Sequence, residues 1–440
     1  MLLKWVNHAS FILESGPVRL LCDPWLRGTV FNNGWSLLSP TKMSYEDFSA
    51  ITHIWFSHEH PDHFCPPNLK QIPEEFRRKI LVLFQHTKDK RVVNLCKSLS
   101  FRVEELPKHQ KVPLAADFSL ICGNQDDLDS WSAVFAEGKA ILNMNDCVFE
   151  WQGELDAVRR AVGDVDVLLS QFSYATWVGN LEDHASHKRY AAQKRAEIAR
   201  QVRTFQPKWF IPFASFIYFS HAENSYMNET VNRIADVHSF SSRELNIPTI
   251  VLYPGDTWEV DTPRDSNDAI QRYECDFDQA MRATPIASLP VELQVLQKAA
   301  DSFFQKCASR NNQLLLKILP PAVVRLKDLG LDVELSFRRG LTEVQNRQPD
   351  IIVSSDSLLN CLTTDWGGET LIINGRFQVP AGGRPRRFFW IFRVPRHNSF
   401  GNSFNFGFLC HQILQKARLA LSWRKRWEQS AAAPELHGNS

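Results

Sequence analysis

The chain has 440 residues, of which 44% are hydrophobic and 22% are charged. That length is too great for one small core and indicates two domains, while the composition is ordinary for a soluble globular protein. The formal net charge of +1 excludes a global field that would attract nucleic acid or an anionic membrane, so we expect no nucleic-acid partner.

The nine cysteines are scattered, and no two of them form a CxxC pair. This spacing argues against a structural zinc site and against a disulfide framework. No apolar run approaches the roughly 18 residues that would span a bilayer. The first residues, MLLKWVNHASFILE, alternate like a strand and lack the charged and apolar regions of a signal peptide. We therefore expect a reduced, cytoplasmic protein with no membrane span.

The first half of the chain consists of short apolar segments typical of strands, separated by segments with helical periodicity. A buried strand at His53–Ser57 runs directly into His58, and a long charged helix is expected from about Asp183 to Thr204. The other expected strands are Leu2–Val6, Ser10–Glu14, Val18–Cys22, Ile80–Phe84, Asp117–Cys122, Ser132–Ala136, Ala140–Asn143, Asp166–Ser170, Lys208–Phe213 and Thr249–Tyr253, with helices at Pro66–Phe76 and Lys88–Leu99. This order predicts two sheets packed face to face with helices outside, over residues 1–260.

Composition changes at about Asp261, where a polar and acidic stretch containing Pro263 predicts a linker over residues 261–290. Residues 291–428 then predict a smaller C-terminal α+β domain, and the small polar residues 429–440 predict a disordered tail. The expected elements of this domain are a helix at Val291–Arg310 and strands at Val333–Phe337, Ile351–Ser354, Thr370–Ile373 and Phe388–Val394.

Four potential metal ligands follow the His53–Ser57 strand within the sequence SHEHPDH. Side chains two apart share a face, so His58 and His60 can reach one ion while Asp62 and His63 curl towards a second. Imidazole and carboxylate ligands suit zinc, iron or manganese, and two close ions can activate water or bind dioxygen. A histidine-rich surface loop is the alternative, which the position at a strand end makes the weaker interpretation.

The sequence resembles the metallo-β-lactamase superfamily, with its αββα sandwich, and more narrowly the non-haem iron domain of CMP-N-acetylneuraminate hydroxylases and their bacterial relatives. Besides SHEHPDH, the stretches that carry the resemblance are CDPW from Cys22, FNNGW from Phe31, ILNMNDC from Ile141, and PFASF from Pro212, which leads to Ser220-His221.

The resemblance implies roles for two further residues. Asp146 matches the carboxylate that bridges the two metals in this superfamily, and His221 matches the distal histidine. However, Ala214 stands where many hydrolases of the superfamily carry their last histidine. His221 is therefore expected to come from a longer loop, with a surface histidine as the alternative.

The third ligand of the first ion is expected to be a carboxylate. Hydrolases of the superfamily supply a histidine after the Asp117–Cys122 strand, whereas this chain has GNQDDLDS from Gly123. Asp129 matches a position in the hydroxylase pattern, Asp126 is the second choice, and an acidic solvated turn is the alternative. An oxygen donor in place of an imidazole favours iron or manganese over zinc.

The leading functional hypothesis is a dinuclear iron oxygenase or hydroxylase of a small-molecule substrate, in which Asp62 and Asp146 take part in catalysis. Relatives with their own Rieske centre carry Cys-x-His and Cys-x-x-His, and no cysteine of this chain has a histidine at either spacing. Dioxygen chemistry would therefore need an external electron donor, a separate redox partner protein. A zinc- or manganese-dependent hydrolase of a phosphodiester, amide or lactone is the alternative, and a binding protein with a structural metal site is the third hypothesis.

Residues near the motif are expected to have supporting roles. His8, at a tight turn, is expected to give structural support rather than to bind metal, and Asp23 is expected to orient a metal-binding histidine. Tyr174 follows a strand near the expected cleft, where substrate contact and buried packing are both open.

Segments of the C-terminal region faintly resemble sterol-carrier-like domains, which frame an apolar groove. The segments are DVELSF from Asp332, DSLL from Asp356 and INGRF from Ile373. A stabilising or dimerisation domain is the alternative interpretation, so a homodimer stays open.

Overall fold

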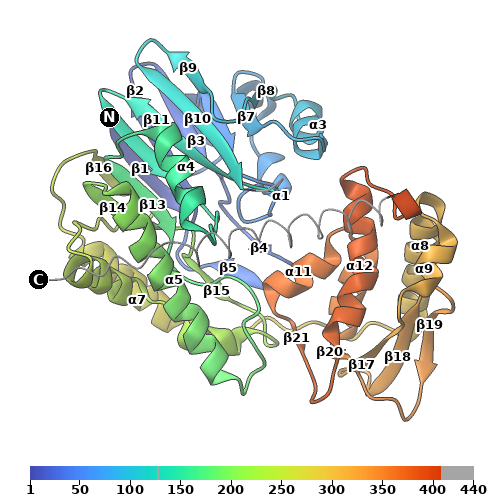
Figure 1. Ribbon diagram of the computed structural model, residues 1–440. Helices are drawn as coiled ribbons and strands as arrows, with labels where there is room; N and C mark the ends of the chain where they lie inside the picture. The colour runs from blue at the N-terminus through green and yellow to red at the C-terminus, as the bar shows by residue number, and fades with distance from the viewer. Residues whose placement is uncertain (126–127, 408–440) are drawn as a thin grey trace, which may run out of the picture. The chain divides into compact units, whose positions relative to one another are not determined.

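The computed structural model describes residues 1–125 and 128–407, which divide into two compact units (Figure 1). Unit 1 consists of Met1–Leu289 together with Glu369–Gln378. Unit 2 consists of Pro290–Gly368 and the described residues from Val379 onward. The expected disordered tail, residues 429–440, lies outside the described residues.

Two large sheets form the body of unit 1 (Figure 1). The seven-stranded sheet has the order β16 (Thr257–Glu259), β1 (Leu2–Asn7), β2 (Ser10–Ser15), β3 (Val18–Cys22), β6 (His53–Phe56), β7 (Leu81–Gln85), β8 (Arg102–Leu106). The six-stranded sheet has the order β14 (Trp209–Phe213), β13 (Val167–Gln171), β12 (Lys139–Asn143), β11 (Asp129–Ala136), β10 (Phe118–Gln125), β9 (Lys111–Ala115). A small third sheet contains β15 (Ile217–Phe219), β5 (Trp35–Leu37) and β4 (Thr29–Val30).

Helices cover the outer faces of both large sheets, with α4 and α5 beside the six-stranded sheet (Figure 1). The α-helices of unit 1 are α1 (Pro66–Leu69), α2 (Glu74–Arg77), α3 (Arg91–Ser98), α4 (Gln152–Val162), α5 (His184–Phe205), α6 (Ile234–Ser239) and α7 (Asn267–Arg282). Shorter helical turns are η1 (Glu46–Ala50), η2 (Ser225–Thr230) and η3 (Phe240–Glu244). The predicted αββα sandwich is therefore confirmed.

Strand β6 shows why the sequence forms this sandwich. Its residue Trp55 packs into the core between the two sheets, whereas its neighbours Ile54 and Phe56 pack into a second core on the outer face of the seven-stranded sheet. Successive side chains of a strand point to opposite faces, so a strand covered on both sides has to be apolar throughout. The run HIWF meets that requirement.

Several element predictions were wrong. Thr249–Tyr253 makes only an isolated bridge, from Thr249 to Phe210, because Pro248 and Pro254 flank it and cannot donate to a ladder. Pro66–Phe76 is two short helices, α1 and α2, separated at Pro73.

The segment expected to be a linker, residues 261–290, instead contains helix α7, whose Ala269 and Tyr273 are buried in the main core of unit 1. Tyr273 also donates a hydrogen bond to the carbonyl of Leu252 at 2.9 Å. The polar residues that suggested a linker are the exposed face of an amphipathic helix.

Unit 1 also includes the short segment Glu369–Gln378, which is held by Arg376. The guanidinium of Arg376 is fully buried and donates to Glu223 Oε2 at 2.7 Å, to the carbonyl of Asn32 at 2.6 Å and to Ser288 Oγ at 2.9 Å. A buried charge is stable only when it is paired and hydrogen-bonded, and this one is.

Unit 2 contains a sheet with the strand order β19-β18-β17-β20 and four helices. Phe388–Val394 was predicted as a strand but lies in a helix, because its buried residues recur at helical spacing; Thr370–Ile373 likewise lies in α11 (Gly367–Asn374). The strands are β17 (Ala322–Leu326), β18 (Leu331–Ser336), β19 (Gly340–Val344) and β20 (Ile351–Val353); the helices are α8 (Leu293–Arg310), α9 (Gln313–Ile318), α10 (Ser355–Thr363) and α12 (Pro385–Ser399). The sterol-carrier resemblance stays a prediction.

Within residues 1–125 and 128–407, no helix is long and apolar enough to cross a membrane.

We predict that Gly123→Ala destabilises unit 1. Gly123 on β10 pairs with Trp131 on β11, whose ring stacks on His109. A Cβ at Gly123 would lie 2.2 Å from the Trp131 ring, and overpacking of this kind costs about 1–3 kcal/mol of unfolding free energy. Urea denaturation measures the change.

Gly153→Ala in α4 is the matched control, because no atom lies within 4 Å of the added Cβ. Replacing this glycine, which lies in the first turn of α4, should leave the unfolding free energy unchanged or raise it by less than about 1 kcal/mol. Equal stability of the two variants would contradict the close packing at Gly123.

Candidate metal centre

The candidate site lies where strand ends of both large sheets meet. Ser57 and His58 follow the carboxyl end of β6, and Asp146 follows that of β12. Asp129 begins β11, which runs antiparallel to β12, so it lies at the same edge. Carboxyl ends of parallel strands form the usual binding edge of such sheets, and the sequence uses this edge to collect distant residues.

Strained turns hold this edge. Among the non-glycine residues with positive φ are His8 after β1, Asp23 after β3, Asn145 after β12 and Ala214 after β14. The backbone N–H of Ala214 donates to the carbonyl of His8 at 3.1 Å and ties two of these turns together. Such conformations are costly and concentrate at functional sites.

Seven side chains form three overlapping groups whose ligand atoms lie within 4.8 Å of one another. The first group is His58, His60 and Asp129. His58 Nε2 lies 2.8 Å from His60 Nδ1 and 3.7 Å from Asp129 Oδ1. Two imidazole nitrogens and one carboxylate oxygen thus face a common point.

The second group is His8, Asp62 and His63, all buried. Asp62 Oδ2 lies 3.4 Å from His8 Nε2 and 3.2 Å from His63 Nε2. This arrangement repeats the first group, with one carboxylate between two imidazoles.

Asp146 lies between the two groups. Its Oδ2 is 3.4 Å from His63 Nε2, and together with His58 and His63 it makes up the third group. Its other oxygen, Oδ1, accepts a hydrogen bond from Gln171 Nε2 at 3.0 Å. Asp146 therefore presents one oxygen to the histidines while the amide holds the other.

The orientation of Gln171 is itself fixed, because its Oε1 accepts from Lys194 Nζ at 2.5 Å. An ammonium can only donate and a carboxylate can only accept, so the amide between them has a single satisfied orientation. Lys194 also pairs with Glu197 at 3.2 Å. A polar chain thus runs from Asp146 to helix α5.

Asp23, which is fully buried, organises the histidines from behind. Its carboxylate accepts from Ser57 N at 2.8 Å, Ser57 Oγ at 2.7 Å and Asn145 Nδ2 at 2.7 Å, and lies 3.0 Å from His63 Nδ1. Ser57 Oγ in turn lies 2.9 Å from His58 Nδ1. With their Nδ1 atoms engaged, His58 and His63 point their Nε2 atoms into the cluster, which is how ligating histidines are usually oriented.

Burial sets the protonation of the first group. Burial, with the neighbouring His63, lowers the pKa of His58 to about 4, and burial, with the adjacent His58, lowers the pKa of His60 to about 4. Burial raises the pKa of Asp129 to about 6. At neutral pH both imidazoles therefore keep a free lone pair, as metal binding requires.

The donor set fits a pair of metal ions. Buried polar atoms almost always have a partner, yet His8 Nε2, His63 Nε2, Asp62 Oδ1 and Asp129 Oδ1 are buried without a hydrogen bond. All four belong to the groups described above. Four imidazoles and three carboxylates exceed what one closed tetrahedral ion can use, and they favour two ions.

The structure brings together six of the seven residues predicted as ligands. They are His58, His60, Asp62, His63, Asp129 and Asp146. The second choice, Asp126, lies outside the described residues.

His221, the seventh predicted ligand, is in none of the three groups. Its Nε2 lies 3.1 Å from Ser288 Oγ and its Nδ1 accepts from the N–H of Glu223 at 3.1 Å. These two residues also bind Arg376, so His221 belongs to the network that holds the segment Glu369–Gln378. No metal-holding group within the described ranges contains it.

The sequence predicts a supporting role for His8, whereas the structure places it inside the second group. The turn after β1 was the one signal at His8 in the sequence. Its proximity to His63 could not be predicted, because 55 residues separate the two along the chain. Asp23 has the orienting contacts that were expected. Tyr174 donates to the carbonyl of Met227 at 2.5 Å and is buried, and it also lines the cavity beside the cluster, so packing and substrate contact both stay open.

A cavity of about 740 Å³ opens onto the cluster and is lined by His60, Asp129 and Asp146. Its opposite wall is helix α5, which contributes Lys194 and Arg200 among others. The volume is that of a small-molecule site.

We predict that Asp23→Asn weakens metal binding without unfolding the protein. Four donors converge on Asp23, and an amide nitrogen would face one of them with another donor. Loss of such a supporting residue typically lowers metal affinity about 10–100-fold. Competition with a chromophoric chelator measures the affinity, and Asp164→Asn, at a fully exposed carboxylate, is the control. Unchanged affinity would contradict the orienting role.

A second pair of variants separates His8 from His221. We predict that His8→Ala loses one bound ion after gel filtration, whereas His221→Ala keeps both, because only His8 reaches the cluster. Elemental mass spectrometry gives the metal content of each folded variant. Loss of metal in His221→Ala alone would support His221 as a ligand in place of His8.

The first part of the chain is similar to known proteins. Residues 2–129 match the Beta-lactamase superfamily domain. The chain is 27% identical over 280 residues to the cytidine monophosphate-N-acetylneuraminic acid hydroxylase of Danio rerio, covering 59% of this chain and 46% of the relative. It is 28% identical over 239 residues to that of Mus musculus, covering 52% and 41%. The chain thus matches less than half the length of either relative.

Among solved structures, CmlA, a diiron β-hydroxylase from Streptomyces venezuelae, matches with a TM-score of 0.44 and 14% identity over 59% of this chain and 54% of that chain. The resemblance of residues 2–129 to the metallo-β-lactamase superfamily is confirmed, and with it the similarity of the first part of the chain to the CMP-N-acetylneuraminate hydroxylases.

Proposed function

We propose that this chain is a dinuclear non-haem iron oxygenase that hydroxylates a small-molecule substrate. The observation that carries the proposal is the carboxylate of Asp129, which stands beside His58 and His60 where hydrolases of the superfamily place a histidine. With Asp62 and Asp146 it raises the number of carboxylates in the cluster to three. Hard oxygen donors favour iron or manganese over zinc.

The proposed ligands are His58, His60 and Asp129 for one ion and His8, Asp62 and His63 for the other, with Asp146 between them. When bound, a pair of reduced irons supplies the capacity to bind and activate dioxygen.

The chain's own residues supply geometry and exclusion of water. Asp23 and Ser57 fix the rings of His58 and His63, and Gln171 holds Asp146 so that only one of its oxygens faces the ions. The proposed metal ligands are mostly buried, and the cavity beside them leaves one side of the cluster open for a substrate. Asp62 and Asp146, the carboxylates among the histidines, are the proposed catalytic ligands.

The similarity to CMP-N-acetylneuraminate hydroxylases supports a hydroxylation but does not identify the substrate. Substrate contacts lie on loops and on the cavity wall, where function varies within one fold. The wall of α5 carries both signs of charge, from Lys194, Glu197 and Arg200. These residues favour a polar substrate.

A metal-dependent hydrolase is the second candidate, and one observation favours it. His8 adds a fourth imidazole to the cluster, and this ligand set suits zinc better than the ligands predicted from the sequence. In that case the ions would lower the pKa of a bound water and polarise an ester or amide.

The deciding experiment is metal analysis of protein purified anaerobically, with Mössbauer spectroscopy of iron-57-loaded material. About two irons per chain with signals of a coupled pair, and reaction of the reduced form with dioxygen, are the expected results. Tightly held zinc, with iron neither retained nor reactive, would overturn the oxygenase in favour of the hydrolase.

A variant sharpens this test. We predict that Asp129→His shifts the metal preference from iron towards zinc, because it restores the histidine of the hydrolase pattern. Iron and zinc contents after exposure to equimolar metals give the preference, and Asp129→Asn controls for loss of charge alone. An unchanged iron to zinc ratio in Asp129→His would remove the observation on which the proposal rests.

A further inference from the structure

We propose that four arginines on helices α4 and α5 form the docking site of a small acidic iron–sulfur protein that delivers electrons to the metal centre. This arginine face consists of Arg159, Arg160, Arg200 and Arg203. The inference rests on the proposed oxygenase function, which requires an electron source.

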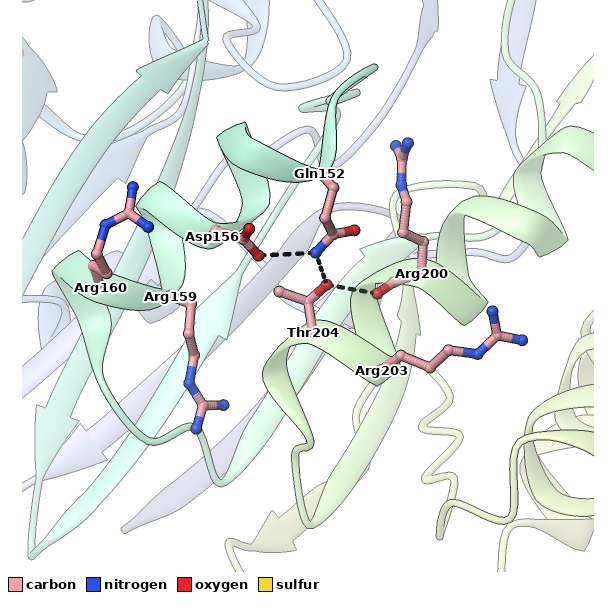
Figure 2. A pocket seen from close by; sticks show the side chains of 7 residues that line it. All are labelled: Gln152, Asp156, Arg159, Arg160, Arg200, Arg203 and Thr204. Carbon is pink, nitrogen blue, oxygen red and sulfur yellow. Dashed lines mark hydrogen bonds between the residues drawn. The ribbon is translucent and has the colours of Figure 1, made fainter. Parts of the chain in front are cut away.

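The arginine face borders a groove of about 590 Å³ between the two helices (Figure 2). Gln152 Nε2 joins the helices across the groove by donating to Asp156 Oδ1 at 2.9 Å and to Thr204 Oγ1 at 2.8 Å. Asp156 is the single acidic residue in the lining. The concentration of positive charge is local, since the whole chain carries a net charge of only +1.

Two of the four guanidinium groups are anchored and two are available. Arg159 donates to the carbonyl of Phe205 and to Asp164, and Arg200 donates to the carbonyls of Phe149 and Glu150. Arg160 and Arg203 are exposed, and neither makes a hydrogen bond or ion pair within the described part of the chain. A rigid base therefore carries two side chains that can bind carboxylates bidentately.

The direction of the side chains indicates the kind of ligand. Figure 2 shows the guanidinium groups of Arg159, Arg160, Arg200 and Arg203 pointing outward in different directions rather than towards one point. They cannot surround a single small anion. They match several separated anionic groups, as on the surface of an acidic macromolecule.

Exposed apolar residues close to the groove favour a protein partner. Trp151, immediately before α4, is 48% exposed, and Val148 is 42% exposed. Tryptophan and arginine are among the residues most enriched at the positions that dominate protein–protein binding energy. A surface of arginines around an apolar contact complements an acidic protein, and complementary charge accelerates the encounter.

The arginine face adjoins the metal centre. Arg200 lines both this groove and the cavity that His60, Asp129 and Asp146 line. Trp151 follows Asp146 by five residues, so their Cα atoms are separated by at most about 18 Å. A partner seated on the groove would therefore hold its cofactor near the metals.

The chemistry calls for such a partner. Hydroxylation of a C–H bond by dioxygen consumes two electrons and two protons: one oxygen atom enters the new C–OH group and the other leaves as water. Two molecules of a one-electron donor are oxidised for each turnover. The 440 residues contain no Cys-x-His or Cys-x-x-His pair, and all metal-holding groups found in the described ranges lie in the one cluster. Electrons would thus have to come from outside these 440 residues.

The test uses a purified plant-type [2Fe–2S] ferredoxin with a strongly negative surface as the probe and the full chain loaded with iron. The variant is Arg160→Glu with Arg203→Glu, and the matched control is Arg243→Glu with Arg282→Glu, two exposed arginines of unit 1 outside the groove. Titration calorimetry gives ferredoxin binding at low and physiological ionic strength. Stopped-flow absorbance gives the rate of iron reduction by ferredoxin and by reduced methyl viologen.

We expect the groove variant to bind ferredoxin about 10-fold more weakly or worse, and to be reduced more slowly by it. Reduction by methyl viologen, which needs no docking site, should be unchanged, and the control variant should behave as the parent. Arg160→Ala with Arg203→Ala, which introduces no new charge, should show a smaller loss in the same direction. Matching thermal unfolding midpoints establish that the variants are folded.

Absence of ferredoxin binding by the parent chain, or equal binding by parent and groove variant, would overturn the docking site. Loss of binding to a single-stranded oligonucleotide in the groove variant, with ferredoxin unaffected, would overturn it in favour of a nucleic-acid surface. A third outcome separates the two proposals. If ferredoxin binding depends on the arginines but the iron protein reduced by methyl viologen does not react with dioxygen, the oxygenase proposal is wrong and the docking site is still supported.

Discussion

The carboxylate of Asp23 is the constraint on which the candidate centre depends. It accepts hydrogen bonds from the backbone and hydroxyl of Ser57 and from Asn145, and it lies within hydrogen-bond distance of His63. These contacts join the ends of β3, β6 and β12, which belong to both large sheets. A single fully buried charge thus ties the sandwich together at the edge where the metal ligands gather, and it aims two imidazoles at the same time. A buried carboxylate is tolerable only with this number of donors, so its structural and functional roles cannot be separated.

Much of the sandwich and of the first ligand group could be predicted from the sequence. Apolar segments of strand length, such as HIWF, predict strands that are covered on both faces of a sheet. The motif HxHxDH after such a strand predicts ligands that lie close together because they are close in sequence. The C-terminal helix over Phe388–Val394 could not be predicted in this way, because aromatic and β-branched residues favour strands while the burial pattern, which decides the matter, depends on neighbours that sequence does not reveal. Helix α7 could not be predicted either, because its polar and acidic residues indicated a linker although Ala269 and Tyr273 are buried in the core.

Two histidines at the site show what the sequence could not predict. His8 and His221 are both histidines near turns, and the sequence offers nothing to rank them. The fold distinguishes them. The carboxyl end of β1 lies at the same edge of the seven-stranded sheet as those of β3 and β6 and brings His8 to His63, whereas the chain after β15 carries His221 to Ser288 and Glu223. Those two residues accept hydrogen bonds from Arg376, a buried charge that must be paired. A histidine that stabilises a buried arginine and one that completes a metal site therefore differ only in tertiary partners, which three-dimensional packing alone supplies.

Helix α5 connects the metal cavity with the arginine face through its own geometry. An α-helix turns by about 100° per residue, so positions three apart drift by about 60° around the axis. Lys194, Glu197, Arg200 and Arg203 follow this drift: the first two face the cavity, Arg200 lines both surfaces, and Arg203 lies on the side opposite Lys194. The stripe from Lys194 to Arg203 rises about 13.5 Å along the axis. Its inner end reaches Asp146 through Gln171, and its outer end projects from the groove. Because opposite sides of one rigid helix serve the two surfaces, charge at the outer end can change without moving the contacts that position Asp146, and docking can be altered independently of the metal site.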